Sequence, residues 1–116
     1  MSADDYNIDD EIDWAELQDF FFEDLKPRFQ EMDALCAAGD AHRLSRIGHS
    51  LKGSGGGVKL DRFTDLGKLL EDAGKASDLP QCLVACRLIR DEYLKYRPDD
   101  ASEVSGYFRD TGRAAA

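Results

Sequence analysis

The sequence predicts an all-α protein folded as an antiparallel four-helix bundle. Apolar residues recur at steps of three and four over most of the 116 residues, and the period-2 alternation of a β-strand is missing. The connections between the helical segments are very short, which favours antiparallel neighbours. A chain of this length can bury one core but not two, so we expect one domain with one site.

The first helix is expected from Asp13 to Ala38, ending at Gly39. Pro27 lies inside it and cannot donate a backbone hydrogen bond, which predicts a kink or a short break. Its apolar stripe consists of Trp14, Leu17, Phe21, Leu25, Phe29, Met32 and Leu35.

The second helix is expected from Ala41 to about Gly57, with Asp40 as its N-cap. Asp61 is the expected N-cap of the third helix, which fades through Gly74 to Ser77. The apolar faces are Leu44, Ile47, Leu51 and Val58 for the second helix and Phe63, Leu66, Leu70 and Ala73 for the third.

The fourth helix is expected to begin after Asp78, with Pro80 in its first turn, and to end before Pro98. Its stripe is Leu83, Cys86, Ile89, Tyr93 and Tyr96. Beyond it the periodicity is lost, so residues 98–116 are predicted to form a mobile tail. The expected organisation is an acidic N-terminal segment (residues 1–12), in which Tyr6 and Ile8 could add a small helical turn, the bundle (13–97) and this tail.

The formal net charge of −9 is unevenly distributed along the chain. Ten acidic residues and no Lys or Arg lie between Met1 and Leu25, whereas the stretch from Ala41 to Leu60 carries four basic residues and no acid. An acidic chain argues against binding nucleic acid or an anionic membrane, because both require clustered Lys and Arg. The charge distribution leaves one cationic segment on an anionic body.

Other features concern the compartment and the cysteines. No apolar run approaches the roughly eighteen residues of a membrane span, and the acidic N-terminus lacks the basic start of a secretory signal, so a cytoplasmic location is expected. The odd number of cysteines, Cys36, Cys82 and Cys86, inside helical segments is typical of buried thiols rather than of a disulfide framework.

The second helix carries the residues that are candidates for chemistry. At about 100° per residue, His49 lies roughly 160° from Ile47 and Leu51 and therefore faces water. The residues expected on the same exposed face are His42, Ser45, Arg46, Lys52, Gly53 and Gly56.

Four glycines, Gly53, Gly55, Gly56 and Gly57, follow His49 within two turns. Each glycine inside a helix costs about 1 kcal/mol relative to alanine, so small residues must be required here. Those that point inward would allow close helix packing. Gly53 and Gly56, one and two turns beyond His49, would keep the approach of a partner open.

An exposed neutral imidazole is a nucleophile at neutral pH and can form a labile phosphoramidate. Phosphoryl transfer also needs positive charge for the equatorial oxygens, which Lys52, one turn from His49, can supply. No acid lies near His49 in the sequence to hold Mg²⁺. We therefore expect no cofactor bound by this chain, with the metal and an aspartyl phosphate coming from the partner.

The run His49-Ser50-Leu51-Lys52-Gly53-Ser54-Gly55-Gly56, preceded by Ala41 and Leu44 and followed by Leu60, resembles the signature of histidine-containing phosphotransfer (HPt) domains of two-component phosphorelays. The resemblance covers about residues 13–97, including the turn at 37–40 and the helical run at 66–71. It implies that His49 accepts a phosphoryl group through Nε2, that Lys52 is the cation beside it, and that Gly53 permits docking of a receiver domain.

One position departs from the family pattern, which often has a second glycine just before the leucine that matches Leu60. Lys59 stands there, so we expect a changed turn, with Gly57 taking over, and an altered partner preference. Ser45, Arg46 and Lys59 are the residues expected to contact the partner.

The expected function is that of a monomeric phosphorelay intermediate. It would accept a phosphoryl group from the aspartyl phosphate of one response-regulator receiver domain and pass it to another, with a hybrid histidine kinase as a further partner. Such a protein is a phosphoryl carrier whose transfer chemistry the receiver completes, not a stand-alone enzyme.

Two alternatives remain open at this point. A non-catalytic helical adaptor would bind receivers or kinases without being phosphorylated. A metal-binding protein using His and Cys is less favoured, because His42 and His49 lie two turns apart and the apolar neighbours of Cys82 and Cys86 indicate a core position.

Overall fold

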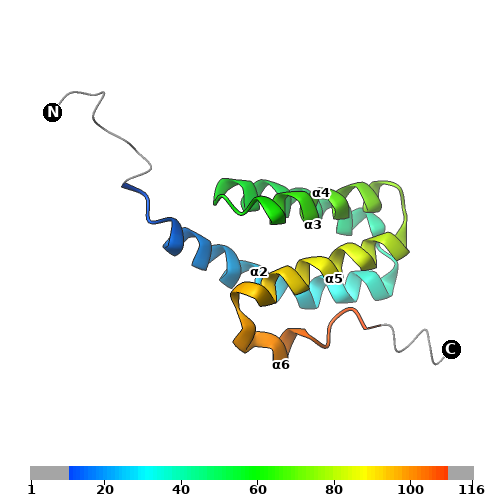
Figure 1. Ribbon diagram of the computed structural model, residues 1–116. Helices are drawn as coiled ribbons and strands as arrows, with labels where there is room; N and C mark the ends of the chain where they lie inside the picture. The colour runs from blue at the N-terminus through cyan, green and yellow to red at the C-terminus, as the bar shows by residue number, and fades with distance from the viewer. Residues whose placement is uncertain (1–10, 110–116) are drawn as a thin grey trace, which may run out of the picture.

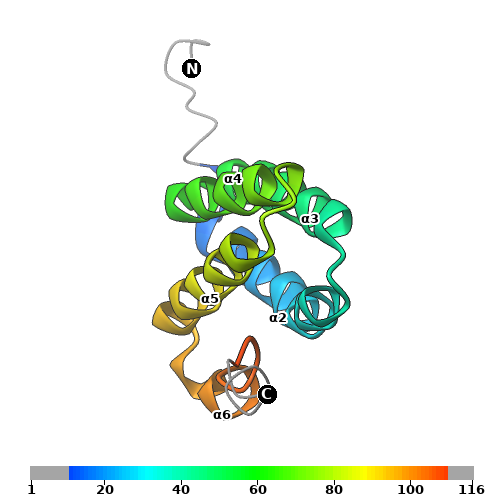
Figure 2. The same ribbon diagram turned by 90° about the vertical axis from the view of Figure 1, so that its right-hand side faces the viewer.

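A computed structural model describes residues 11–109 of the chain and shows a helical bundle (Figure 1). Its elements are α2 (Trp14–Ala38), α3 (Ala41–Gly57), α4 (Asp61–Lys75), α5 (Leu79–Tyr96), the 3₁₀ turn η2 (Pro98–Asp100) and α6 (Ala101–Val104). No strand occurs among these residues. Each long helix packs against the next along the chain, and α2 packs against α5 to close the bundle (Figure 2). The prediction of an all-α four-helix bundle is confirmed.

Aspartate side chains begin three of the four long helices. Asp13, Asp40 and Asp78 each accept a hydrogen bond of 3.1 Å from the backbone N–H three residues on. Asp61 was expected to do the same for α4, and this expectation is wrong. α4 already includes Asp61, and its N-cap is Leu60, which is buried and donates its backbone N–H to the Gly55 carbonyl at 2.8 Å. The tight turn after α3 therefore starts α4 one residue early.

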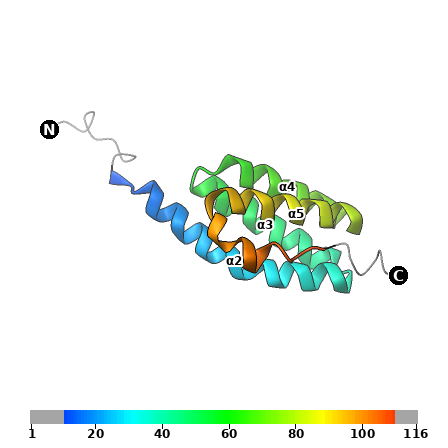
Figure 3. The same ribbon diagram turned by 60° about the horizontal axis from the view of Figure 1, so that its bottom comes forward.

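Of the kink or short break predicted at Pro27, no break occurs, because helix α2 runs without interruption through this residue. Figure 3 shows that the N-terminal half of α2 is set at an angle to the C-terminal half, as a missing backbone hydrogen bond allows. The helix ends as predicted at Gly39, whose φ of 71° is the left-handed conformation that glycine adopts readily.

The core is rich in aromatic rings, and it lies between the four long helices. Phe29 contacts Tyr93 edge to face with centroids 5.2 Å apart, and Phe22 contacts Phe63 at 5.8 Å. Most residues of the predicted stripes are buried, but Leu17 is 38% exposed. It lies in the first turns of α2, which run past the end of the bundle (Figure 1). No helix in the described part of the chain is both long and apolar enough to cross a membrane.

Residues 98–109, predicted to belong to a mobile tail, are instead folded against α2 and α5. Val104 and Phe108 are 1% exposed. The Phe108 backbone N–H donates to Asp33 Oδ1 at 2.9 Å, and its carbonyl accepts from Arg87 Nε at 2.7 Å. Side chains of α2 and α5 thus hold the backbone of this segment, which a search for apolar periodicity does not detect. The rest of the predicted tail, residues 110–116, and the turn expected at Tyr6 and Ile8 lie outside the described residues.

Helices α3 and α4 approach each other more closely than side chains would allow. A Cβ atom at Gly48 would lie 2.4 Å from the backbone nitrogen of Glu71, and one at Gly67 would lie 2.5 Å from the backbone nitrogen of Lys52. Two glycines that face each other therefore let the two backbones touch. This contact brings residues of α4 up to the middle of α3, where His49 lies.

Candidate functional site

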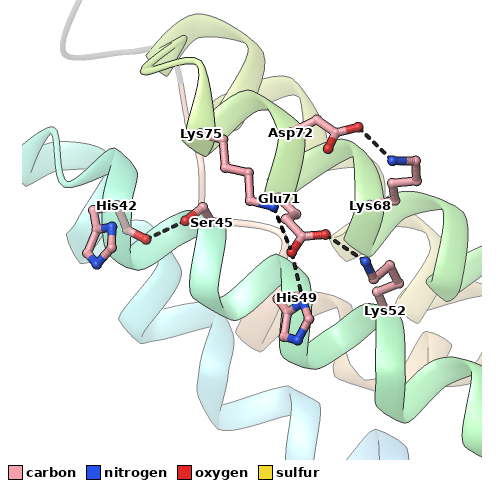
Figure 4. A network of polar contacts seen from close by, with 8 residues as sticks. All are labelled: His42, Ser45, His49, Lys52, Lys68, Glu71, Asp72 and Lys75. Carbon is pink, nitrogen blue, oxygen red and sulfur yellow. Dashed lines mark hydrogen bonds and ion pairs between the residues drawn. The ribbon is translucent and has the colours of Figure 1, made fainter.

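His49 projects from the middle of α3 with 70% of its side chain exposed, as the helical wheel predicted. Its ring is not free to rotate, because Nδ1 lies 2.8 Å from Oε2 of Glu71 on α4 (Figure 4). The second ring nitrogen points away from Glu71 in the same view. The imidazole is therefore both accessible and held in one orientation.

Glu71 is the buried centre of a small polar network. Its residue is 5% exposed, and its Oε1 accepts a hydrogen bond of 2.8 Å from Lys52 Nζ. The Lys75 ammonium lies 3.5 Å from Oε2. The hydrogen bond from Lys52, opposed by burial and aided by His49 and by the charges of Lys52 and Lys75, lowers the pKa of Glu71 to about 2. Glu71 is thus a carboxylate at every pH at which the protein would work.

The charge on Glu71 decides which ring nitrogen of His49 carries the proton. A carboxylate can only accept hydrogen bonds, so Nδ1 must donate to it. In a neutral imidazole the other nitrogen, Nε2, then keeps its lone pair. The arrangement leaves the exposed Nε2 as the nucleophilic atom, in agreement with the atom that the family resemblance implies.

The network carries a net positive charge beside His49. The ammonium groups of Lys52 and Lys75 outnumber the single carboxylate of Glu71 by one, with the imidazole neutral. Lys52 is 34% exposed, so its ammonium touches both Glu71 and solvent. An ammonium has three donors, and those not used on Glu71 are available to an anion that approaches His49.

Sequence reasoning missed Glu71. The search for an acid near His49 was confined to neighbours in the sequence, whereas Glu71 lies 22 residues away and reaches His49 across the α3–α4 contact. Two signals were present in the sequence: a glycine inside each helix, at Gly48 and Gly67, and an acid four residues after Gly67. Glycines that face each other on adjacent helices indicate a place where the backbones meet.

The glycines after His49 fall into two groups. A Cβ atom at Gly53 would have no atom within 4 Å, so the open approach expected beside His49 exists at this position. A Cβ atom at Gly55 would lie 2.9 Å from Cβ of Phe63, which makes it a packing glycine. Gly56, also expected to keep the approach clear, is exposed, but a Cβ atom there would lie 3.2 Å from Thr64 Oγ1 of α4. Its small size therefore also serves the contact between α3 and α4.

Of the three residues expected to contact a partner, Ser45 is buried and cannot do so. It is 7% exposed, and its Oγ donates to the His42 carbonyl at 2.7 Å. Gly74 of α4 packs directly on it, since a Cβ atom at Gly74 would lie 2.6 Å from Cβ of Ser45. The helical wheel placed Ser45 on the exposed face with His49, and the close approach of α4 covers that position.

Arg46 and Lys59 are both exposed, in different surroundings. Arg46 lines a groove between α2 and α3 together with Leu35, Arg43 and Ile47. Lys59 lies beyond the end of α3, with its ammonium 4.4 Å from the centre of the Trp14 ring. Its backbone has a φ of 61°, the conformation that glycine favours, so the expectation that Gly57 takes over the turn is wrong. Lys59 itself adopts the conformation of the missing glycine.

A shallow groove lies between α2 and α3. Its apolar walls are Phe21 and Leu25 of α2 and Ile47 and Leu51 of α3, with Arg28 and Ser50 also lining it. Within residues 11–109 no group of three or more His, Cys, Asp and Glu side chains is placed to hold a metal ion. The site thus consists of an exposed, oriented imidazole with positive charge beside it.

Comparison with known proteins agrees with this geometry. The family model of the Hpt domain matches residues 16–97, which is well over half of the chain. The searches of curated proteins and of solved structures give no match. The matched range begins in the first turn of α2 and ends just after α5, so it takes in all four long helices and His49 with its network. The chain belongs to the Hpt domain family.

Proposed function

We propose that His49 accepts a phosphoryl group from the aspartyl phosphate of a receiver domain and passes it to the aspartate of a second receiver. Membership of the Hpt family gives the chain a phosphotransfer role in two-component signalling. The observation that carries the specific proposal is the exposed His49 ring whose Nδ1–H is tied to the buried carboxylate of Glu71.

The transfer step follows from this hydrogen bond. The lone pair of Nε2 attacks phosphorus in line, the N–P bond forms, and the bond between phosphorus and the aspartyl oxygen breaks, leaving a carboxylate on the receiver. The proton stays on Nδ1, so the phosphorylated ring carries a positive charge. Glu71 faces that charge at 2.8 Å and stabilises it.

The same arrangement supports the onward step. A positively charged ring is a good leaving group, so the N–P bond breaks when the carboxylate of the second receiver attacks phosphorus. The electron pair returns to Nε2, and His49 is again neutral with its proton on Nδ1. Atoms and charges balance in both directions without an added proton donor.

Lys52 has two contacts in this proposal. One donor holds Glu71 in place, and the remaining donors face the equatorial phosphoryl oxygens, where negative charge must be offset. Mg²⁺ is proposed to come from the receiver.

The test uses the two histidines of the chain as a matched pair. Receiver domains labelled with radioactive acetyl phosphate are mixed with wild-type protein, with His49→Gln and with His42→Gln. Because both histidines are exposed on α3, the two variants differ chiefly in which ring is removed. We expect acid-labile, base-stable label on the wild type and on His42→Gln, and none on His49→Gln.

Label that survives in His49→Gln would disprove the proposal. Tight binding of receivers to the wild type without any label would instead identify the protein as an adaptor that presents the bundle but takes no part in the chemistry.

A further inference from the structure

The three cysteines of the chain lie close together, away from the network around His49. Cys36 is in the last turn of α2, and Cys82 and Cys86 lie one turn apart on α5. The sulfurs of Cys36 and Cys86 are 3.9 Å apart. None of these thiols has a place in the phosphoryl transfer proposed above.

The three thiols differ in access to solvent. Cys82 and Cys86 are 0% exposed, whereas Cys36 is only half-buried. Cys36 lines an open groove between the end of α2 and the start of α5, two segments that lie side by side in Figure 1. Ala37, Leu79 and Leu83 form apolar walls of this groove, and Arg87 borders it. A small oxidant in the groove would therefore meet Cys36 first.

We propose that Cys36 and Cys86 form a disulfide that links α2 to α5 when a hydroperoxide enters this groove. The Cys36 sulfur attacks the peroxide, becomes a sulfenic acid and is oxidised by two electrons, while the peroxide is reduced and released as water or alcohol. The Cys86 sulfur then attacks the Cys36 sulfur. The S–O bond breaks, the S–S bond forms, and the hydroxyl leaves with the Cys86 proton as water.

The order of the two steps follows from the burial of Cys86, which is 0% exposed and therefore does not meet a peroxide in the groove. Contact with Cys36 and burial also raise the pKa of the Cys86 thiol, which favours Cys36 as the first thiol to react. Its contact with Cys36 keeps it within reach of a sulfenic acid formed there. Disulfide sulfurs lie about 2.05 Å apart, so the two atoms must approach by about 2 Å from their present contact.

Cys82 provides the matched control. It is as buried as Cys86, and burial raises the pKa of its thiol too, but the sulfur in contact with Cys36 belongs to Cys86. The experiment treats the full chain in its native state with a few equivalents of hydrogen peroxide. Remaining thiols are then alkylated in denaturant, and peptides are mapped by mass spectrometry without reduction.

We expect wild-type protein to yield a Cys36–Cys86 peptide that has lost two hydrogens, with Cys82 alkylated. Cys82→Ala should give the same cross-link at a similar rate. Cys86→Ala should give none, and its Cys36 should accumulate as a sulfenic acid that dimedone traps.

Three results would overturn the proposal: all three thiols alkylated in oxidised wild type, a bond from Cys36 to Cys82, or a bond between two chains. Each is read from the wild type alone, so the outcome stands even if Cys86→Ala fails to fold.

Discussion

The bundle can be divided into two halves, the helix pair α3–α4 and the helix pair α2–α5, and the helices of each pair are held together by different contacts. Between α3 and α4 the backbones touch at Gly48 and Gly67, and the side chain buried at this contact is the charged Glu71. Between α2 and α5 the contact includes aromatic rings, with Phe29 packed against Tyr93 and against Phe108 of the C-terminal segment. The α3–α4 half is defined by a close contact between two backbones, and the α2–α5 half by buried aromatic side chains.

This difference explains where the chemistry lies. A hydrogen bond of 2.8 Å from His49 to Glu71 requires two helices at a fixed distance, and backbone contact fixes distance better than long side chains do. Aromatic side chains bury large apolar areas and dominate the energetics of a core. The halves should therefore respond differently to substitution, with stability lost in one and transfer lost in the other.

The largest expected effect on stability comes from Phe108→Ala, far from His49 in the α2–α5 half. Removal of a ring that is 1% exposed should lower the free energy of unfolding by about 3 to 4 kcal/mol, measured by urea denaturation. Phe20→Ala, at a position that is 58% exposed, should change it by less than about 0.5 kcal/mol. Transfer to His49, measured where the variant is still folded, should stay within about twofold of wild type. An equally large loss of transfer would show that the halves are coupled.

The next largest effect should come from Gly48→Ala in the other half. The new Cβ would lie 2.4 Å from the Glu71 nitrogen and 2.6 Å from the Gly67 carbonyl oxygen, so the two helices must separate. We expect a loss of about 2 to 3 kcal/mol in urea and slower transfer, because Glu71 is carried away from His49. Gly53→Ala is the control, since its Cβ meets no atom within 4 Å. Better helix propensity should raise its stability by up to about 1 kcal/mol. Equal losses of stability in the two variants would contradict close backbone contact as the cause.

The fold was predictable from the sequence to the extent that it depends on local pattern. The apolar steps of three and four place the four helices, and the aspartates at 13, 40 and 78 mark three of their starts correctly. The prediction fails at the C-terminal segment. The Phe108 backbone N–H there donates to Asp33, and the Phe108 carbonyl accepts from Arg87. These contacts join residues far apart in the chain and leave no periodic signal.

The site was predictable only on the face of a single helix. The exposure of His49 and the open space at Gly53 follow from the wheel of α3. Whatever depends on α4 was missed or misplaced: Glu71 was overlooked, and Ser45 was put on the surface although Gly74 covers it. A wheel describes one helix in isolation, and the glycines that let the second helix approach act across the chain.

Glu71→Gln tests whether the buried charge directs His49. An amide can donate to Nδ1, which would place the ring proton on Nε2 and remove the nucleophile. We expect the rate of transfer at saturating receiver to fall by about 10- to 100-fold, equal to about 1.4 to 2.7 kcal/mol of transition-state stabilisation. Glu92→Gln is the matched control, because Glu92 is also buried and bound to a lysine, Lys95, but lies on α5. An unchanged rate in Glu71→Gln would mean that the carboxylate serves only the packing of α3 and α4.

The smallest expected effect is a difference in acid sensitivity between wild type and Glu71→Gln. The pKa of Glu71 is about 2 in the folded protein against an ordinary value of 4.5, so its charged contacts stabilise the fold fully above about pH 4.5. This contribution is lost as the pH falls from 4.5 towards 2, because the unfolded chain then binds a proton that the folded chain does not. The glutamine variant has no such group, so between pH 6 and pH 3 its free energy of unfolding in urea should fall less steeply than that of wild type. Parallel curves would show that the partners of Glu71 do not favour its charged form. The α3–α4 contact would then depend on the two glycines alone. The two halves would differ in how closely their helices approach, and the buried charge of Glu71 would not add to that difference.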